Sequence, residues 1–206
     1  MRLPARIFLM VLFLPVASFG QYHSPADSAT EGTVYTSFFF RFRYSFTASW
    51  VPQTGDMAEQ VPNVGQARLS DEGNPGKAGK SYYLLTLFRT LPGQGIAGRS
   101  RAFISVVAED VSSNPQITNG KDCVLKLAEH MKKARFAAVG EPKEMHVNGR
   151  TFFRQDMKGT SSAGAPVYQS AIFTTTGGYA LGFLLISPNP SLLANMAGTV
   201  NTIQFY

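Results

Sequence analysis

The side chains that could carry out nucleophilic or acid–base chemistry are few in this sequence. It contains one cysteine, Cys123, and three histidines, His23, His130 and His146. Cys123 and His130 fall seven residues apart on one predicted helix, which separates them by about 10 Å along the helix axis. A thiolate–imidazole pair needs hydrogen-bond contact, so these two residues cannot act as nucleophile and base. We expect Cys123 to be a buried, small apolar side chain instead.

Motifs for metals, hydrolases and nucleotides give no better candidate. The cysteines and histidines lack the spacing of a zinc site, and G-x-S-x-G is absent. Gly93, Gly95 and Gly98 match G-x-G-x-x-G, the dinucleotide fingerprint. That fingerprint requires a helix to begin directly after it, so that the helix N-terminus faces the pyrophosphate. Residues 103–107 have a strand pattern instead, so we interpret the glycines as a hairpin loop. We predict no catalytic residue, no metal and no cofactor.

Two groups of charged side chains remain as candidates for an anion-binding site. Arg154 and Asp156 lie two apart on a predicted strand and so share one face, and Gln169 on the following strand could come close. Charges in a sheet are costly unless they are paired. A structural ion pair or a solvated sheet face is therefore favoured, and an arginine site for an anionic ligand is the alternative. Arg41 and Arg43 also share one strand face, which is either solvated or an anion-binding pair.

The elements that would position these residues form a meander near the C-terminal end of the sequence. Asn148-Gly149 between apolar runs predicts a hairpin, because a type I′ turn needs positive φ at both central residues. Gly177-Gly178 predicts a second tight reversal. A short lead-in at 145–147 is therefore followed by three predicted strands, at 150–157, 167–175 and 179–186.

Alternating aromatic residues predict another strand, from Tyr35 to Phe46, which ends at Trp50-Val51-Pro52. Two further strands are predicted at 81–90 and 101–110. Residues 53–80, between the aromatic strand and the strand at 81–90, have no regular pattern of apolar residues. A segment of that length is either functional or disordered. A helix should begin at Thr118 or Asn119 and run to about residue 136, and Asn189-Pro190 predicts the start of a second helix.

The N-terminal 20 residues have the features of a secretory signal peptide. Two arginines precede an apolar segment at 7–16, and Ser18-Phe19-Gly20 offers a cleavage site before Gln21. An uncleaved anchor is the alternative. Cleavage would lower the formal charge from +6 to +4, because the signal carries two of the 19 basic residues. We therefore expect a flexible leader at 21–32, one domain at 33–206, and a secreted or periplasmic location without nucleic-acid binding.

The order of elements resembles the PsbP-like superfamily. The residues that carry the resemblance are Trp50-Val51-Pro52, the Asn148-Gly149 hairpin with the strand 151–156, the strand 178–183 and the closing residues 203–205. The superfamily includes the extrinsic P protein of photosystem II, a Ran-binding nuclear import factor and exported bacterial proteins of unknown role. The resemblance implies an α+β fold in which an antiparallel sheet is covered by helices as an α/β/α sandwich. It transfers no functional residue, and residues 53–80 depart from its pattern.

Three functions remain compatible with these features. The favoured one is an exported, noncatalytic binding or assembly module whose partner is another envelope or secreted protein. The second is a carrier of a small apolar or anionic ligand in a cleft beside the sheet. The third is an enzyme of unrecognised type. A cleft with convergent polar groups would favour the second or third function.

Overall fold

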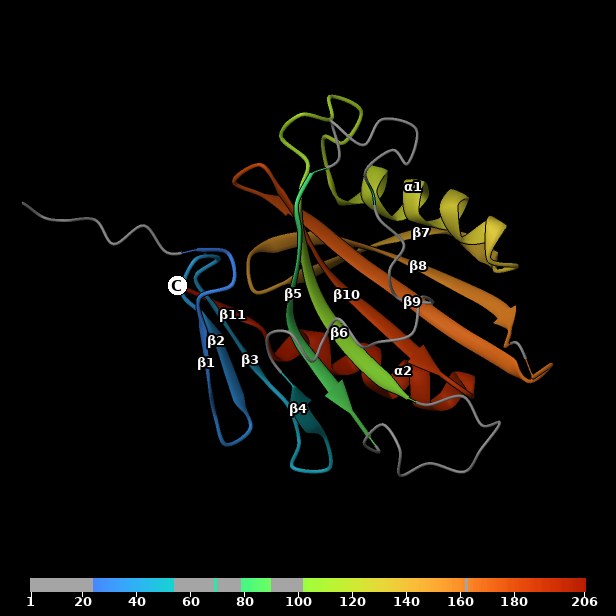
Figure 1. Cartoon of the computed structure of the whole chain (residues 1–206), viewed down its shortest axis with the longest axis horizontal. Helices are drawn as coiled ribbons and strands as arrows, with labels where there is room; N and C mark the ends of the chain where they lie inside the picture. Colours follow the sequence, from blue (N-terminus) through green and yellow to red (C-terminus); the bar gives the residue numbers. More distant parts are fainter. Residues whose placement is uncertain (1–23, 54–68, 70–78, 90–101, 162) are drawn as a thin grey trace, which may run out of the picture.

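Eleven strands in the described part of the protein form two antiparallel sheets (Figure 1). A computed structural model describes residues 24–53, 69, 79–89, 102–161 and 163–206. The larger sheet has seven strands in the order β4-β5-β6-β10-β9-β8-β7, so the predicted meander forms one half of it. These strands are β4 (Val51–Gln53), β5 (Ser81–Phe88), β6 (Phe103–Asp110), β7 (Ala137–Val147), β8 (Arg150–Thr160), β9 (Pro166–Thr176) and β10 (Tyr179–Ser187).

The smaller sheet joins the N-terminal and C-terminal ends of the described region. Its order is β1-β2-β3-β11, with β1 (Ser28–Glu31), β2 (Val34–Ser37), β3 (Phe42–Ser45) and β11 (Gln204–Phe205). The described residues also form two α-helices, α1 (Gly120–Lys133) and α2 (Pro190–Thr199), and the 3-10 helix η3 (Val200–Thr202) leads from α2 to β11. No helix in the described residues is long and apolar enough to cross a membrane.

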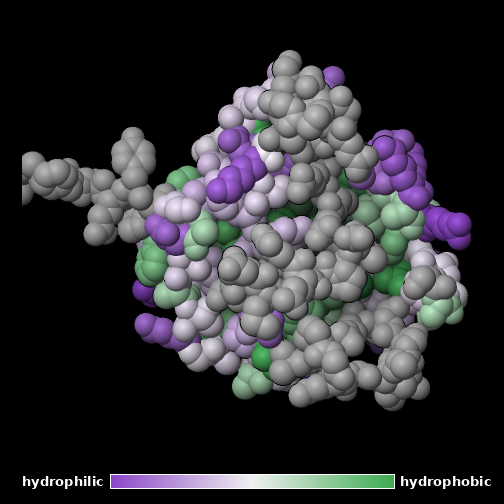
Figure 2. Space-filling model, in the orientation of Figure 1, coloured by the Kyte–Doolittle hydropathy of each residue, from purple (hydrophilic) through white to green (hydrophobic). Residues whose placement is uncertain are grey.

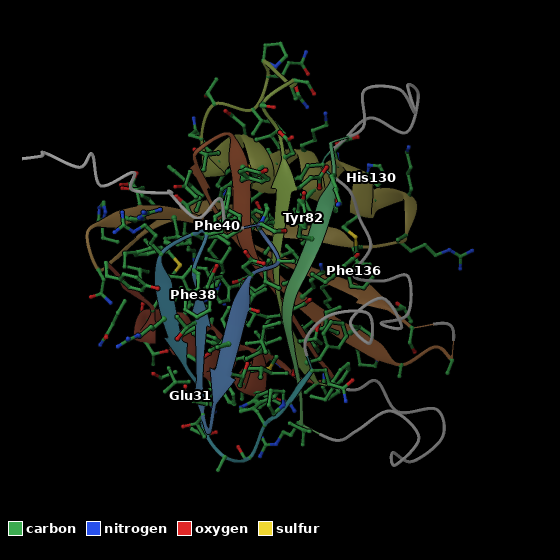
Figure 3. All side chains as sticks on the ribbon, turned by 60° about the vertical axis from the view of Figure 1, so that its left-hand side comes forward. Glu31, Phe38, Phe40, Tyr82, His130 and Phe136 are labelled. Carbon is green, nitrogen blue, oxygen red and sulfur yellow. The ribbon has the colours of Figure 1, made fainter. Side chains whose placement is uncertain are left out.

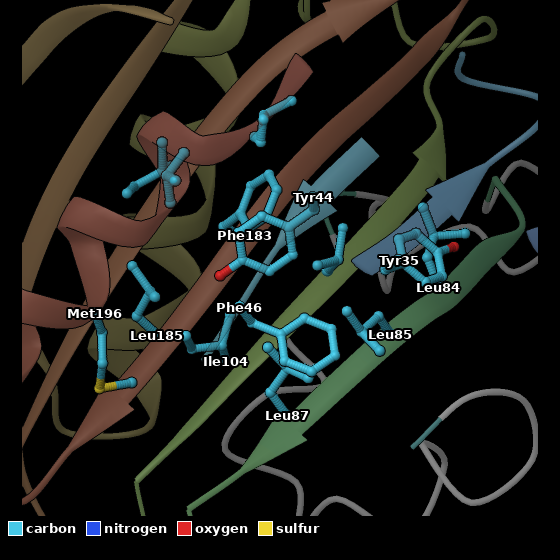
Figure 4. Packing of buried hydrophobic residues seen from close by; sticks show 14 of the residues in the cluster. Tyr35, Tyr44, Phe46, Leu84, Leu85, Leu87, Ile104, Phe183, Leu185 and Met196 are labelled. Atoms are coloured by element: carbon cyan, nitrogen blue, oxygen red, sulfur yellow. The ribbon is translucent and has the colours of Figure 1, made fainter. Parts of the chain in front are cut away.

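Each face of the seven-stranded sheet has its own hydrophobic core. On one face, buried residues of α2 and of the small sheet pack against residues such as Ile104 and Phe183. Figure 4 shows Tyr44 lying against Phe183, with ring centroids 5.3 Å apart. On the other face, Leu127 and Met131 of α1 pack against the sheet. The fold is therefore α+β and antiparallel, as predicted, but the sandwich differs in detail, because the four-stranded sheet shares one outer layer with α2.

Helix α1 begins where its capping residues predict. Asn119 accepts hydrogen bonds from the backbone N–H groups of Lys121 and Asp122, and Asp122 completes a capping box. The apolar stripe is buried and includes Cys123, which has no exposed surface. Lys132 and Lys133 are exposed in the last turn, where positive charge complements the helix dipole. Figure 2 shows hydrophilic side chains gathered over this end of the helix.

The Asn148-Gly149 hairpin is confirmed. Asn148 has φ +45° and Gly149 has φ +84°, which are the positive angles that a type I′ turn requires. The side-chain amide of Asn148 also donates a hydrogen bond to the carbonyl of Ile203, just before β11. Gly177 and Gly178 make the second reversal with φ +56° and +81°. The hairpin thus fixes the register of β7 and β8 and contacts the C-terminal segment.

The prediction of one strand from Tyr35 to Phe46 is wrong, because the segment folds into two strands. The alternating burial holds from Phe40 to Phe46, but Arg41 has φ +54° and lies in a turn between β2 and β3. Aromatic contacts hold this turn against the large sheet. The rings of Phe39 and Phe40 each lie 5.4 Å from that of Tyr179, which itself lies 6.3 Å from Tyr82. Figure 3 shows Phe40 and Tyr82 close to each other in the view, near its centre.

Three other boundaries differ from the prediction. Residues 28–31, inside the expected leader, form β1, and the lead-in at 145–147 is the end of the eleven-residue strand β7. Trp50 is buried, but Val51 and Pro52 begin β4 rather than ending the aromatic strand. The expected signal peptide, His23, the fingerprint glycines and residues 54–68 and 70–78 of the expected loop lie outside the described residues. Leu69 is buried, and its N–H donates to the Glu109 carboxylate at 2.9 Å.

Candidate functional site

A shallow pocket of about 430 Å³ lies where β8 and β9 separate at one end of the large sheet. The two strands pair in regular register as far as Phe153 and Phe173. Beyond that point the Thr174 hydroxyl donates to the Thr151 carbonyl at 2.8 Å, so a side chain bridges the two strands. The pocket in this fork, here called the fork pocket, is lined by Arg150, Thr151 and Phe153 of β8, Thr174–Thr176 of β9, and Asn119 and Gly120 at the start of α1.

Arg150 supplies the positive charge of the fork pocket. Its Nη1 donates to the Thr176 hydroxyl at 3.0 Å, and its Cζ lies 4.0 Å from the centroid of the Phe205 ring. Burial lowers the pKa of Arg150, although a guanidinium remains charged at any ordinary pH. No carboxylate of the described residues forms a salt bridge with it. The guanidinium is therefore held in place, partly desolvated and without a counter-ion among these residues.

The start of α1 closes one side of the pocket, and two of its first-turn N–H groups are used in its own cap. Gly120 packs so closely that a Cβ there would lie 2.1 Å from the Phe173 carbonyl oxygen. The capping box uses the first-turn N–H groups of Lys121 and Asp122. Hydrogen bonds from the Thr118 hydroxyl and backbone lower the pKa of Asp122, so a carboxylate occupies the positive end of the helix dipole.

Arg154 and Asp156 form an ion pair, which is one of the two structural arrangements that the favoured interpretation allows. Arg154 Nε lies 2.8 Å from Asp156 Oδ1, and both side chains are partly exposed. Gln169 is not part of this pair. The register places it opposite Met157, on the face covered by α1, whereas Arg154 and Asp156 lie on the other face, opposite Ile172 and Ser170. The prediction that Gln169 approaches Arg154 and Asp156 is wrong. Side chains alternate between the two faces of a sheet, and Gln169 is one residue away from the position opposite Asp156, so it points to the other face.

Arg41 and Arg43 lie on the small sheet and do not converge on the other candidates. Both are exposed, and the Arg43 guanidinium lies 5.8 Å from the centroid of the Tyr206 ring. The backbone N–H of Tyr206 donates to the Arg41 carbonyl at 3.1 Å. The five predicted site residues therefore lie in three separate places, with Gln169 buried, and the structure brings together only Arg154 and Asp156.

The remaining reactive side chains stay apart in the described residues. Cys123 is buried, and burial raises its thiol pKa to about 12. His146 is exposed, with Nε2 3.2 Å from a Glu144 carboxylate oxygen. Among the residues that the structure describes, no group of three or more histidine, cysteine, aspartate or glutamate side chains could hold a metal ion.

Sequence reasoning missed the fork pocket. Arg150 is separated from Thr176 by 26 residues and from Phe205 by 55, so no local pattern joins them. One signal was available in the sequence. Three threonines at 174–176 end one predicted strand of the meander, and Arg150 begins the strand before it.

Comparison with known proteins identifies the fold. No protein-family model and no curated protein matches the sequence. Among solved structures, the protein is similar to cyanobacterial PsbP from Synechocystis sp. PCC 6803, with 11% identity and a TM-score of 0.52 over 93% of this chain and 99% of that one. A protein of unknown function from Pseudomonas aeruginosa matches over 65% of this chain and 86% of that one, with 16% identity and a TM-score of 0.38. The protein has a PsbP-like fold.

Proposed function

We propose that the protein is an exported, noncatalytic module that binds another protein of the cell envelope or secreted space. The observation that carries this proposal is the composition of the fork pocket. Of the described residues that line it, Arg150 alone is titratable, and the others offer hydroxyl, amide and aromatic groups. Such a lining can hold and orient a ligand, but it contains no group that exchanges protons near neutral pH.

Two further features support the proposal. The N-terminal 20 residues have the pattern of a signal peptide, which supports export and cleavage before Gln21. The fold resembles that of cyanobacterial PsbP, and the superfamily is not known for a shared catalytic site. A binding role therefore agrees with both the fold and the pocket.

A carrier of a small anionic ligand is the second candidate. The volume of the fork pocket, about 430 Å³, lies within the range of small-molecule sites. A carrier would retain a low-mass ligand through purification, whereas an assembly module would retain a protein.

The test is native mass spectrometry of the protein purified from the cells that produce it, with chemical cross-linking before lysis. We expect a mature N-terminus at Gln21 and a recurrent cross-linked protein partner. A retained small molecule without a protein partner would support the carrier. A protein that keeps residues 1–20 and is recovered from the cytoplasm would contradict export.

A further inference from the structure

We propose that the fork pocket binds a single carboxylate group, with the Arg150 guanidinium as its cationic partner. The inference deepens the proposed function and rests on it where the carboxylate belongs to a partner protein. A guanidinium that is partly buried, held by a hydroxyl and without a counter-ion among the described residues is preorganised for an anion.

The position of Arg150 is fixed by its neighbours on both sides. The Thr176 hydroxyl accepts from Nη1, and the Phe205 ring supports the guanidinium at 4.0 Å. Phe205 is itself held between Phe42 and Phe152, with ring centroids 6.0 and 6.3 Å away. An arginine fixed in this way loses little side-chain entropy when it binds, and its remaining N–H donors can form the bidentate contact that a planar carboxylate accepts.

The charge around the pocket favours a monoanion over a phosphate dianion. Arg150 is the one cationic side chain that lines the pocket within the described residues. The nearest helix terminus is occupied by the capping carboxylate of Asp122, which would repel a second negative charge. The rest of the lining consists of four threonines, Phe153, Asn119 and Gly120, and it carries no charge. A carboxylate on a short, partly apolar stem matches this combination, as at the C-terminus of a polypeptide, on a glutamate side chain or in a small organic acid.

The experiment is an amide NMR titration of the purified protein with acetyl-diglycine, which carries a free carboxylate. Acetyl-diglycine amide is the uncharged control, and acetate and inorganic phosphate are the comparison anions. We expect acetyl-diglycine to shift the amide signals of Thr151, Gly120 and the threonines at 174–176, and we expect the amide form to leave them unchanged. Equal shifts with the two peptides, or tighter binding of phosphate, would overturn the proposal.

Arg150→Met tests the role of the guanidinium, because methionine keeps an unbranched apolar side chain against Phe205 while removing the charge. We expect the affinity for acetyl-diglycine to fall roughly tenfold or more, as the loss of a charge-assisted hydrogen-bond pair implies. Arg154→Met is the matched control. It removes an arginine four residues along the same strand that already has Asp156 as its partner, and it should leave the affinity unchanged.

Unfolding in urea shows whether each variant is folded, and Arg150→Lys serves as the second variant if the methionine variant is not. The lysine variant should also bind more weakly, because it lacks the planar fork. Unchanged binding in a folded Arg150 variant would overturn the proposal.

The same titrations identify the source of the carboxylate. Together with the cross-linking, they also test the carboxylate site separately from the proposed protein-binding function. If acetate binds as tightly as acetyl-diglycine, the natural ligand is a small organic acid. If acetyl-diglycine binds more tightly than acetate, the carboxylate belongs to a partner protein. If acetyl-diglycine binds through Arg150 but no protein cross-links, the assembly function fails and the carboxylate site stands. If a protein cross-links equally to wild type and Arg150→Met, and the titration shows no carboxylate binding, the site fails and the assembly function stands.

Discussion

Gln155 and Gln169 are two buried glutamines on the same face of neighbouring strands, and they differ in hydrogen bonding. Gln155 Nε2 donates to the carbonyls of Gly140 and Asp156, at 3.2 and 2.9 Å. Neither side-chain polar atom of Gln169 has a partner in the described structure, although the residue has no exposed surface. An unsatisfied buried amide is costly, so this difference should be visible in stability.

We therefore predict opposite effects of the same substitution at the two positions. Gln169→Met should raise the free energy of unfolding by about 1–2 kcal/mol, because it removes an amide without a partner. Gln155→Met should lower it by about 1–3 kcal/mol, because it leaves two carbonyls with one hydrogen bond fewer. Urea unfolding of both variants measures these changes. A destabilised Gln169→Met variant would mean that the amide has a partner in the folded protein.

Cys123 makes a second residue-scale prediction, which concerns alkaline pH. Burial is the main cause that raises its pKa from 9.0 to about 12, and the charges of Asp122 and Glu109 add to it. Because the folded pKa is the higher one, the stability from the neutral thiol is fully present below pH 9 and is lost as the pH rises through 12. Cys123→Ala should therefore lose less stability than wild type over that range.

Thiol reactivity gives an independent measurement of the same property. The native thiol should react with a disulfide reagent at about pH 8 far more slowly than the urea-unfolded thiol, because only an accessible thiolate attacks. Equal rates in the two states would show that Cys123 is accessible in the folded protein.

At the scale of elements, the β7–β8 hairpin depends on the backbone conformation of Gly149. Its φ is +84°, and a Cβ added there would meet nothing within 4 Å. The cost of a side chain is therefore backbone strain alone, without a steric clash. We predict that Gly149→Val lowers the free energy of unfolding by about 1–2 kcal/mol.

Gly198 provides the control for this prediction. It lies in α2 at an ordinary helical φ, and a Cβ there also meets nothing within 4 Å. Gly198→Ala should raise stability by up to about 1 kcal/mol, because glycine is a poor helix former. The two variants separate positive-φ strain from the general effect of adding a side chain, and equal stability of Gly149→Val and wild type would contradict a type I′ turn.

Elements with strong local signals were predictable, and those that depend on distant contacts were not. The Asn148-Gly149 turn and the Asn119 cap are determined by neighbouring residues, and both are confirmed. The turn at Arg41 escaped detection because the aromatic alternation continues through it, and its cause is contact with the distant Tyr179. Strand β7 was seen only at its end because most of its side chains are exposed, so polar and apolar residues do not alternate along it. The fork pocket was missed for the same reason as the Arg41 turn.

At the scale of the whole molecule, the C-terminal strand β11 connects the two sheets. It pairs with β3 through Gln204 and Phe205, and the Phe205 ring contacts Phe152 of the large sheet. Deleting residues 204–206 should therefore expose the edge of β3 and loosen the small sheet. We predict faster hydrogen exchange of the β2 and β3 amides, with unchanged exchange in β9 and β10. Equal acceleration in both sheets would show that they open as one unit.

Both edge strands of the large sheet are poorly suited to pairing with a strand of another protein. At one edge, β4 is three residues long and contains Pro52, which has no N–H to donate. At the other edge, pairing in β7 is irregular between Val139 and Lys143, where Gly140 has φ +69°. Bulges, prolines and charges of this kind block templated growth of cross-β filaments. The edges of the large sheet should therefore resist pairing with another chain, and a partner that approaches them would have to recognise side chains rather than add a strand.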